Sequence, residues 1–243
     1  MSIFNRIKAG EIHFTPQREA GEFEEFIAKP SIKSIPDWYK SIKRNYDSTQ
    51  QDIQRDFRAK VMPNGTIKKC IPFLDAFSAG YMFTLPCDVK FDESTGIFGW
   101  NIDIQPITMH DPRQIEGVDL SSEYLKSAYK WINFNSMETP KGWSCLITHP
   151  LNRLDLPFTT LSAVVDTDKH TQAINFPFVM KSGFSGVISA GTPIAQIIPF
   201  KRNKWKSVLG KFDKAKQEKE KFQITKHIED NYKKTIWEKK DYE

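Results

Sequence analysis

The chain has 243 residues, of which 39% are hydrophobic and 27% charged. This composition is typical of a globular protein that is long enough to bury one sizeable core. No run approaches the roughly 18 apolar residues of a membrane-spanning helix, and the pattern of residues 1–14 predicts no secretory signal. The three cysteines form no CxxC pair, which argues against a disulfide framework or a zinc knuckle and favours an intracellular protein.

The net charge of +5 is unevenly placed. Residues 201–243 hold 14 Lys/Arg and 8 Asp/Glu, a balance of +6, which leaves 21 basic and 22 acidic residues in 1–200, a balance of −1. A basic tail can meet phosphate or an acidic protein surface. The interspersed acidic residues favour the simpler interpretation of a solvated helix face, so nucleic acid as a partner stays open.

Residues 1–60 are predicted to form an N-terminal extension with one short helix. Pro36 suits the first turn of a helix. Four apolar side chains then follow at helical spacing, namely Ile35, Trp38, Tyr39 and Ile42. We expect Trp38 to pack onto a core. The stretch 45–60 is highly polar and predicts a loop.

Residues 61–200 predict a β-barrel or sandwich. A Pro-Asn-Gly turn at 63–65 is followed by a predicted strand, Thr66–Ile71. Further short strands are expected where apolar residues alternate or cluster, at 88–91, 97–104, 131–134, 143–147 and 173–179. Short strands broken by Pro and Gly, with no long helix between them, indicate antiparallel sheets.

Residues 201–243 predict a basic tail of amphipathic helices. Trp205, Val208, Leu209 and Phe212 follow helical spacing, and a second series is made of Ile224, Ile228, Tyr232 and Ile236. An apolar helix face has to be buried, either on the rest of the chain or on a partner protein.

The stretch 159–200 carries the most informative pattern. An apolar strand ends in the acidic turn Asp166-Thr-Asp168, a second and a third strand follow, and the segment Gly191-Thr-Pro-Ile-Ala-Gln196 completes it. Asp166 is the candidate general base that activates a water, with Asp168 orienting it or holding a metal. The alternative, which we favour, is that both acids cap a hairpin through hydrogen bonds.

A second polar group follows the predicted strand 143–147. His149 and Arg153 are candidate binding residues, with Arg153 reaching an anion. The alternative is a loop held by an Arg153–Asp155 pair, which we favour. His110, Asp111 and His170 add possible metal ligands, but the spacing of a facial iron triad is absent. We therefore expect no metal and no cofactor.

Other reactive residues have simpler interpretations. Cys145 lies in an apolar strand and is predicted to be a small core residue. Ser144 lacks the glycines of a nucleophile elbow. The glycines of 183–191 lie between strands, so they indicate a hairpin and not a phosphate-binding loop.

Four segments resemble, in order, motifs of the dUTPase-like fold. They are Ala79-Gly-Tyr-Met-Phe83, Thr139-Pro-Lys-Gly-Trp143, Ala163-Val-Val-Asp-Thr-Asp168 and Val187–Ile198, and together they span about half the chain. The resemblance implies a β-clip barrel, often trimeric, and Mg²⁺-dependent hydrolysis of a nucleoside triphosphate. It makes Asp166 the catalytic residue and places Gln196 with Asp168 among the candidate binding residues.

Several residues that this chemistry needs are missing. Met82 stands where the family has its first aspartate, and 148–153 lacks the Ser-Gly pair that grips phosphates. Lys169 replaces the tyrosine that packs under the deoxyribose. The Gly-rich C-terminal arm is also absent, because Gly210 is the only glycine after residue 200, and a phosphate clamp made of backbone needs glycine.

The full length is also similar to a set of tailed-bacteriophage proteins, notably from phages of cyanobacteria. The phrases that carry this resemblance include KKCIPFLDAFSAGYMF, TPKGWSCLITHPLNR and GTPIAQIIPFKR. It implies a place in the host cytoplasm or in the virion, and it brings no activity with it.

We therefore predict a non-catalytic structural or interaction protein, a homo-oligomer with a trimer favoured. Its helical tail would offer a site for a partner protein. The alternatives are a diverged pyrophosphatase that uses Mg²⁺ and a cupin-like small-ligand binder.

Overall fold

The computed structural model describes residues 7–47, 49, 65–219 and 231–243. They fall into two compact units. The first, here called the sheet unit, comprises 1–34, 79–202 and 242–243. The second, here called the helical unit, comprises 35–78 and 203–241. Each unit is described by itself.

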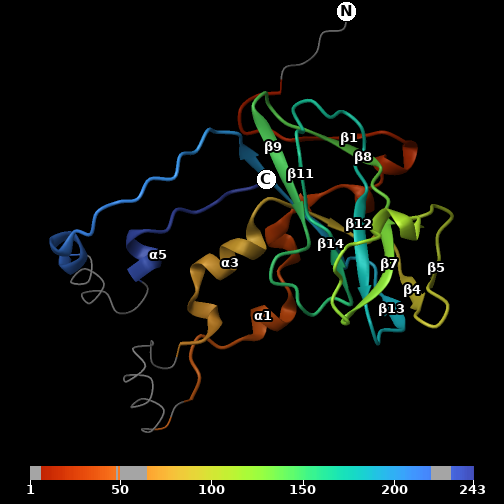
Figure 1. The fold of residues 1–243 in the computed structure, drawn as a ribbon, viewed down its shortest axis with the longest axis horizontal. Coiled ribbons are helices and arrows are strands. Elements are labelled where there is room, and N and C mark those ends of the chain that lie inside the picture. The colour runs from red at the N-terminus through yellow and green to blue at the C-terminus, as the bar shows by residue number, and fades with distance from the viewer. Residues whose placement is uncertain (1–6, 48, 50–64, 220–230) are drawn as a thin grey trace, which may run out of the picture. The chain divides into compact units, whose positions relative to one another are not determined.

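The sheet unit contains four antiparallel sheets (Figure 1). The largest has the order β11 (Ala163–Val165), β9 (Trp143–Thr148), β14 (Pro193–Lys201), β3 (Tyr81–Thr84) and β2 (Lys29–Pro30). The next has the order β10 (Phe158–Thr160), β12 (Phe176–Lys181), β7 (Tyr124–Trp131) and β6 (Ile107–Met109). The third joins β13 (Gly186–Ile188), β4 (Val89–Asp92) and β5 (Ile97–Trp100), and the fourth pairs β1 (His13–Pro16) with β8 (Asn135–Glu138). The predicted mainly β, antiparallel class is confirmed, while the dUTPase-like type stays a prediction.

Aromatic side chains fill the core of this unit. The rings of Trp131 on β7 and Phe178 on β12 stack with centroids 3.8 Å apart. Phe158 from β10 meets Trp131 edge to face at 5.0 Å. All three side chains are fully buried, and the edge-to-face pair has a geometry in which aromatic contacts add to the stabilisation that burial supplies. Cys145 is buried in the same core, as its apolar strand predicted.

Gly80 marks a close backbone approach at the start of β3. Its φ is +67°, in the left-handed region that favours glycine. A Cβ at this position would lie 1.9 Å from the carbonyl oxygen of Ile197, on the neighbouring strand β14. The pairing of Tyr81 with Ile197 begins here, so the register of β3 on β14 depends on the missing side chain.

The helical unit departs from one strand prediction. Thr66–Ile71 is not a strand: a 3-10 turn, η4, spans Ile67–Lys69, and α3 spans Ile71–Ser78. The Thr66 hydroxyl accepts a hydrogen bond from the Lys68 backbone N–H and so caps the turn. The apolar residues of α3 recur at helical spacing, and Ile71 and Phe77 are buried. Burial of this helix face outweighs the β propensity of the segment.

The short N-terminal helix is confirmed as α1, Asp37–Ser41, with Pro36 at the position just before it. Tyr39 is the buried side chain, and its ring lies 5.0 Å from that of Phe77 on α3. Trp38 also contacts Phe77, at 5.8 Å, although 39% of its surface stays exposed.

Strand boundaries differ where polar side chains take over the backbone. The predicted strand 131–134 is wrong, because β7 ends at Trp131 and Asn133 then bonds to neighbouring loops. The predicted strand 97–104 ends early, at Trp100, and a bend follows. The remaining short turns lie at η1 (Glu19–Glu22), η2 (Glu24–Phe26), η3 (Ser31–Ser34) and η5 (Pro112–Ile115).

The predicted helix over Trp205–Phe212 is wrong. Residues 202–213 contain neither helix nor strand, and a helix begins only at residue 214. Short helices are marginal in water without a surface against which to pack, and Gly210 weakens this one further. The second predicted series is confirmed only around Tyr232, on α5 (Asn231–Thr235), because Ile224 and Ile228 lie outside the described residues.

Candidate functional site

The acidic turn lies beside the first residues of β9. Val165 at the end of β11 pairs with Cys145 on β9, so Asp166 comes opposite Ser144. The turn closes locally, since the backbone N–H groups of Lys169 and His170 both donate to the Asp166 carbonyl. The local sequence places two carboxylates in this turn. The pairing of β11 and β14 with β9 brings the start of β9 and the end of β14 beside them.

Arg202, the residue that follows β14, binds both carboxylates. Its Nη1 lies 2.8 Å from Oδ1 of Asp166 and 2.8 Å from Oδ1 of Asp168. Its Nη2 contacts the second oxygen of Asp168, so this pair is bidentate. The Asp168 side chain is only 3% exposed, whereas that of Asp166 is 52% exposed. We call Arg202, Asp166 and Asp168, together with Ser144 and Gly142, the arginine–aspartate clamp.

The backbone completes the clamp. Gly142, in the turn before β9, donates its N–H to Oδ2 of Asp168 at 2.8 Å, and its carbonyl accepts from the Arg202 N–H. The Ser144 hydroxyl donates to Asp166 at 2.7 Å. The two aspartates in the turn after β11 are therefore joined to β9 and the turn before it, through Ser144 and Gly142, and to Arg202 directly after β14. The clamp ties three neighbouring strands together at one end of the sheet.

These contacts weaken both aspartates as bases. The Ser144 hydrogen bond, followed by that of Arg202, lowers the pKa of Asp166. The Arg202 hydrogen bonds lower the pKa of Asp168 from 3.8 to about 2. A general base works best with a pKa near the operating pH, and these shifts move both carboxylates further from it.

The clamp makes the stability of the folded chain depend on pH. The folded pKa of Asp168 lies below its ordinary value, so its stabilising contribution is present above about pH 4 and is lost as the pH falls through about 2. We expect the melting temperature of the native chain to fall over this window by more than that of Asp168→Asn. Thermal melts followed by circular dichroism measure this. Parallel pH profiles of the two proteins would contradict it.

His149, Arg153 and Gln196 meet at the other end of β9. Arg153 forms a bidentate pair with Asp155, as the favoured alternative predicted. The His149 Nδ1 accepts from the Thr160 N–H, and its Nε2 lies 3.1 Å from the Arg153 carbonyl. Burial lowers the pKa of this imidazole. Both ring nitrogens of His149 therefore contact backbone groups.

Gln196 holds the same loop from β14. Its Oε1 accepts from the Leu151 N–H at 2.9 Å, and its Nε2 donates to the Ala79 carbonyl at 2.6 Å. The side chain is fully buried. This group and the clamp lie at opposite ends of β9, about 16 Å apart at the rise of a strand. The candidate residues therefore do not converge on one site.

The remaining histidines bring no ligand set together. His110 bonds to Gln114 on η5, and His170 is exposed in the acidic turn. Among the described residues, no three His, Cys, Asp or Glu side chains are placed to hold a metal ion.

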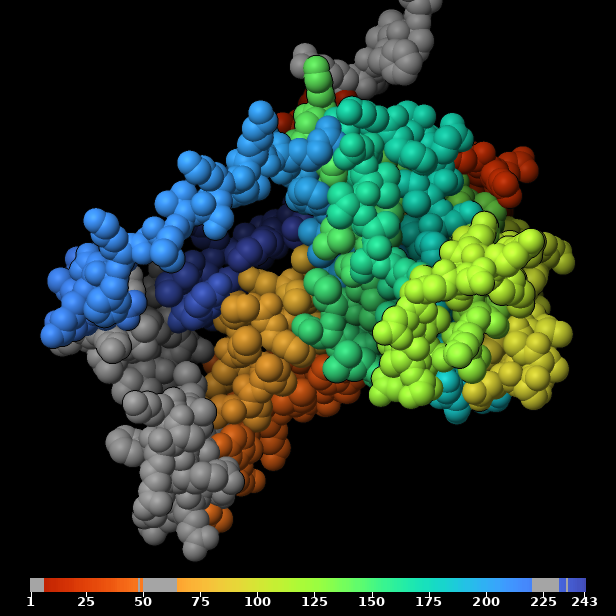
Figure 2. All heavy atoms as spheres, viewed as in Figure 1, coloured from red at the N-terminus to blue at the C-terminus, as the bar shows by residue number. Residues whose placement is uncertain are grey.

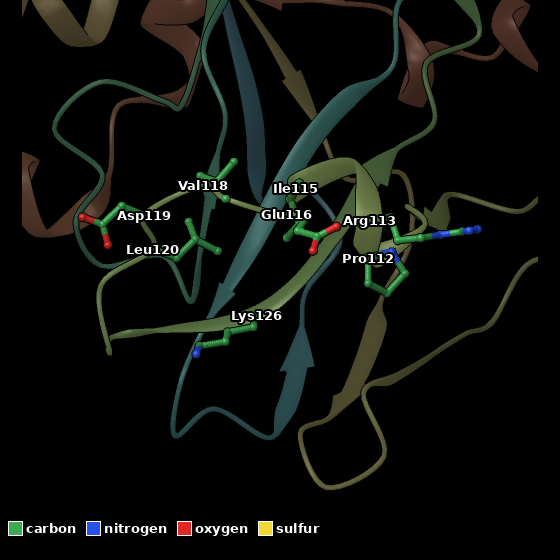
Figure 3. Close-up of a pocket in the computed structure, with 9 residues that line it drawn as sticks. Pro112, Arg113, Ile115, Glu116, Val118, Asp119, Leu120 and Lys126 are labelled. Carbon is green, nitrogen blue, oxygen red and sulfur yellow. The ribbon is translucent and has the colours of Figure 1, made fainter.

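A surface hollow of about 500 Å³ lies under the loop 112–120, against Lys126 at the start of β7 (Figure 3). Its charged lining has both signs. In Figure 3 the Arg113 and Asp119 side chains point away from one another, and Arg113 is paired with Asp111. The side chains that line this hollow do not form a recognisable catalytic or binding site.

Arg202 is the functional neighbour that sequence reasoning missed. It stands 34 residues after Asp168 in the sequence, and only the pairing of β14 with β9 brings the two side chains together. The signal was a charged residue directly after the long apolar strand 193–201, at the same sheet edge as the acidic turn.

No helix among the described residues is long and apolar enough to cross a membrane. The comparisons with known proteins found no matching family model, curated protein or solved structure.

Proposed function

We propose that this chain is a non-catalytic structural or interaction protein that assembles with further copies of itself through the segment 203–213, here called the arm. One observation carries the proposal. The four large apolar side chains of the arm are almost fully exposed: Trp205 by 88%, Val208 by 76%, Leu209 by 98% and Phe212 by 81%.

The arm is exposed in the way expected of a segment that binds to a surface on another molecule. Figure 2 shows its side chains uncovered on the face in view, just after β14. Residues 203–212 of the arm make no hydrogen bond with any other described residue. Burying one such apolar side chain contributes about 1.5–3 kcal/mol, so four of them supply up to about 12 kcal/mol per arm. Contiguous apolar exposure of this kind marks interaction sites.

A second copy of the chain is the occupant that we propose. Closed rings are the usual outcome when each copy offers one segment and one receiving surface. The resemblance to the dUTPase-like fold supports a trimer, since such bodies often trimerise by sharing arms. The resemblance to tailed-phage proteins supports a role in, or with, a virion.

The clamp supports the non-catalytic part of the proposal. Asp166, the one catalytic candidate, is hydrogen-bonded to Ser144 and paired with Arg202. Asp168 is buried against the same arginine. Both carboxylates are used to join strands, as structural ion pairs are.

The test is the mass of the native chain in solution. We expect sedimentation velocity at about 100 µM, far above the Kd of a stable oligomer, to give a multiple of the 28.1 kDa chain mass. A triple variant, Trp205→Ser, Leu209→Ser and Phe212→Ser, is expected to sediment as a monomer. The matched control replaces Lys204, Lys206 and Lys211 of the same arm by serine, and it should assemble like the native chain.

Three outcomes would overturn the proposal. A monomeric native chain, or a triple variant that assembles normally, would remove the arm from assembly. Release of pyrophosphate from a nucleoside triphosphate with Mg²⁺, lost in Asp166→Ala, would establish catalysis instead.

A further inference from the structure

A second hollow, of about 750 Å³, lies in the sheet unit where β6 and the end of β7 meet the segments 17–20 and 172–175. Its lining is rich in carboxamides and contains one cation: Gln17, Gln105, Asn133, Gln172, Asn175 and Arg18. We call it the carboxamide pocket. Its volume lies in the range of about 300–1,000 Å³ that small-molecule sites occupy. Neither assembly nor the clamp uses it.

The floor of the pocket is held rigidly by its own hydrogen bonds. The Asn133 side chain donates to the carbonyls of Asn135 and Ile174, at 2.6 and 3.2 Å. Its backbone N–H donates to Oδ1 of Asn175 at 3.0 Å. The Asn175 amide nitrogen makes no hydrogen bond with another described residue, so a fixed donor remains for a ligand. Preorganised polar groups of this kind reduce the entropy cost of binding.

The rim offers further uncommitted groups. Gln105 and Gln172 are exposed, and neither side chain bonds to another described residue. Each carboxamide can donate and accept at once. A sugar hydroxyl can also donate and accept at once. A ring with several hydroxyls can therefore form a hydrogen bond with each of these carboxamides.

Arg18 supplies the charge. Its guanidinium lies over the Phe134 ring, 5.9 Å from the centroid, and it pairs with no carboxylate among the described residues. The lining contains neither Asp nor Glu, so its net charge is positive. Stacking on the ring holds the planar guanidinium and leaves its N–H edge for a bidentate acceptor. A carboxylate has that geometry.

The aromatic side chain of the pocket argues against a nucleobase. Proteins hold unpaired bases largely by stacking them on exposed aromatic rings. Phe134 is only 4% exposed, and Arg18 covers its ring. No ring among the lining residues is left as a stacking platform.

From these observations we propose that the carboxamide pocket binds an acidic monosaccharide, a hydroxyl-rich ring that carries one carboxylate. Arg18 would take the carboxylate, and the carboxamides of Gln105, Gln172 and Asn175 would take the hydroxyls.

Saturation-transfer NMR on the full chain tests this with D-glucuronate as the probe, and with D-glucose, acetate and uridine monophosphate at equal concentration. We expect transfer to glucuronate that exceeds transfer to the other three. Arg18→Ala should weaken glucuronate binding at least about tenfold, the effect of losing one charge-assisted hydrogen bond pair. Gln105→Ala should weaken it less, because a neutral bond is lost. Arg113→Ala is the matched surface-arginine control and should leave binding unchanged.

Several results would overturn the proposal. They are no transfer to glucuronate, equal transfer to glucose or acetate, preferential transfer to the nucleotide, or undiminished binding by Arg18→Ala. Arg18 is exposed and forms no ion pair among the described residues, so the variant is expected to fold, and its thermal melt verifies this before binding is measured.

Discussion

Replacing Gly80 by alanine is expected to disrupt the largest sheet of the molecule. The new Cβ would lie 1.9 Å from the Ile197 carbonyl oxygen, and the backbone would keep an unfavourable φ of +67°. The left-handed conformation alone costs about 1–2 kcal/mol, and relief of the clash requires β3 to separate from β14. We expect a total of about 3 kcal/mol or more, seen as a melting temperature about 10 °C lower and a reduced soluble yield.

Gly191→Ala is the matched control. Gly191 also has a left-handed φ, +79°, but nothing lies within 4 Å of an added Cβ. Its substitution carries only the conformational cost, about 1–2 kcal/mol. Equal effects of the two substitutions would show that the close approach at Gly80 does not set the strand pairing.

Replacing Arg202 by alanine is expected to lower the melting temperature by about 5 °C or more, because it leaves the buried Asp168 carboxylate without its cation. The loss should shrink as the pH falls from about 4 towards about 2, because the native chain itself then loses the stabilising charge of Asp168. Melts of the native and variant proteins across pH 2–7 measure both effects.

Arg113→Ala provides the comparison. Arg113 also pairs with an aspartate, Asp111, but its side chain is 83% exposed. Exposed pairs contribute little, so this variant should melt within about 1 °C of the native chain. If both arginine variants melt alike, the clamp does not stabilise the sheet.

Local patterns predicted the parts of the fold that depend on neighbouring residues. The acidic turn after the strand 163–165 and the helix after Pro36 each follow from a few adjacent side chains, and both are found. The clamp needed a contact between residues 34 positions apart, which no local pattern carries. The carboxamide pocket is harder still to predict, because its carboxamides and its arginine come from four separate segments of the chain.

The arm shows why a correct apolar spacing can still predict the wrong structure. Trp205, Val208, Leu209 and Phe212 have helical periodicity, but periodicity produces a helix only when a surface covers the apolar stripe. For Tyr39 on α1 that surface exists, in the ring of Phe77. For the arm, no described part of the chain covers the apolar stripe, and the segment contains neither helix nor strand.

The discontinuous make-up of the helical unit also sets an order of events on the ribosome. Residues 35–78 leave the exit tunnel well before residues 203–241, with the whole of 79–202 between them. At about 5–20 residues per second, this interval lasts about 6–25 s. The sheet unit can complete β14 during that time, while the nascent 35–78 segment waits for the rest of its unit. Chaperones that shield apolar segments during synthesis are therefore expected to bind residues 35–78. A ribosome stalled after Arg202 would present these residues without residues 203–241.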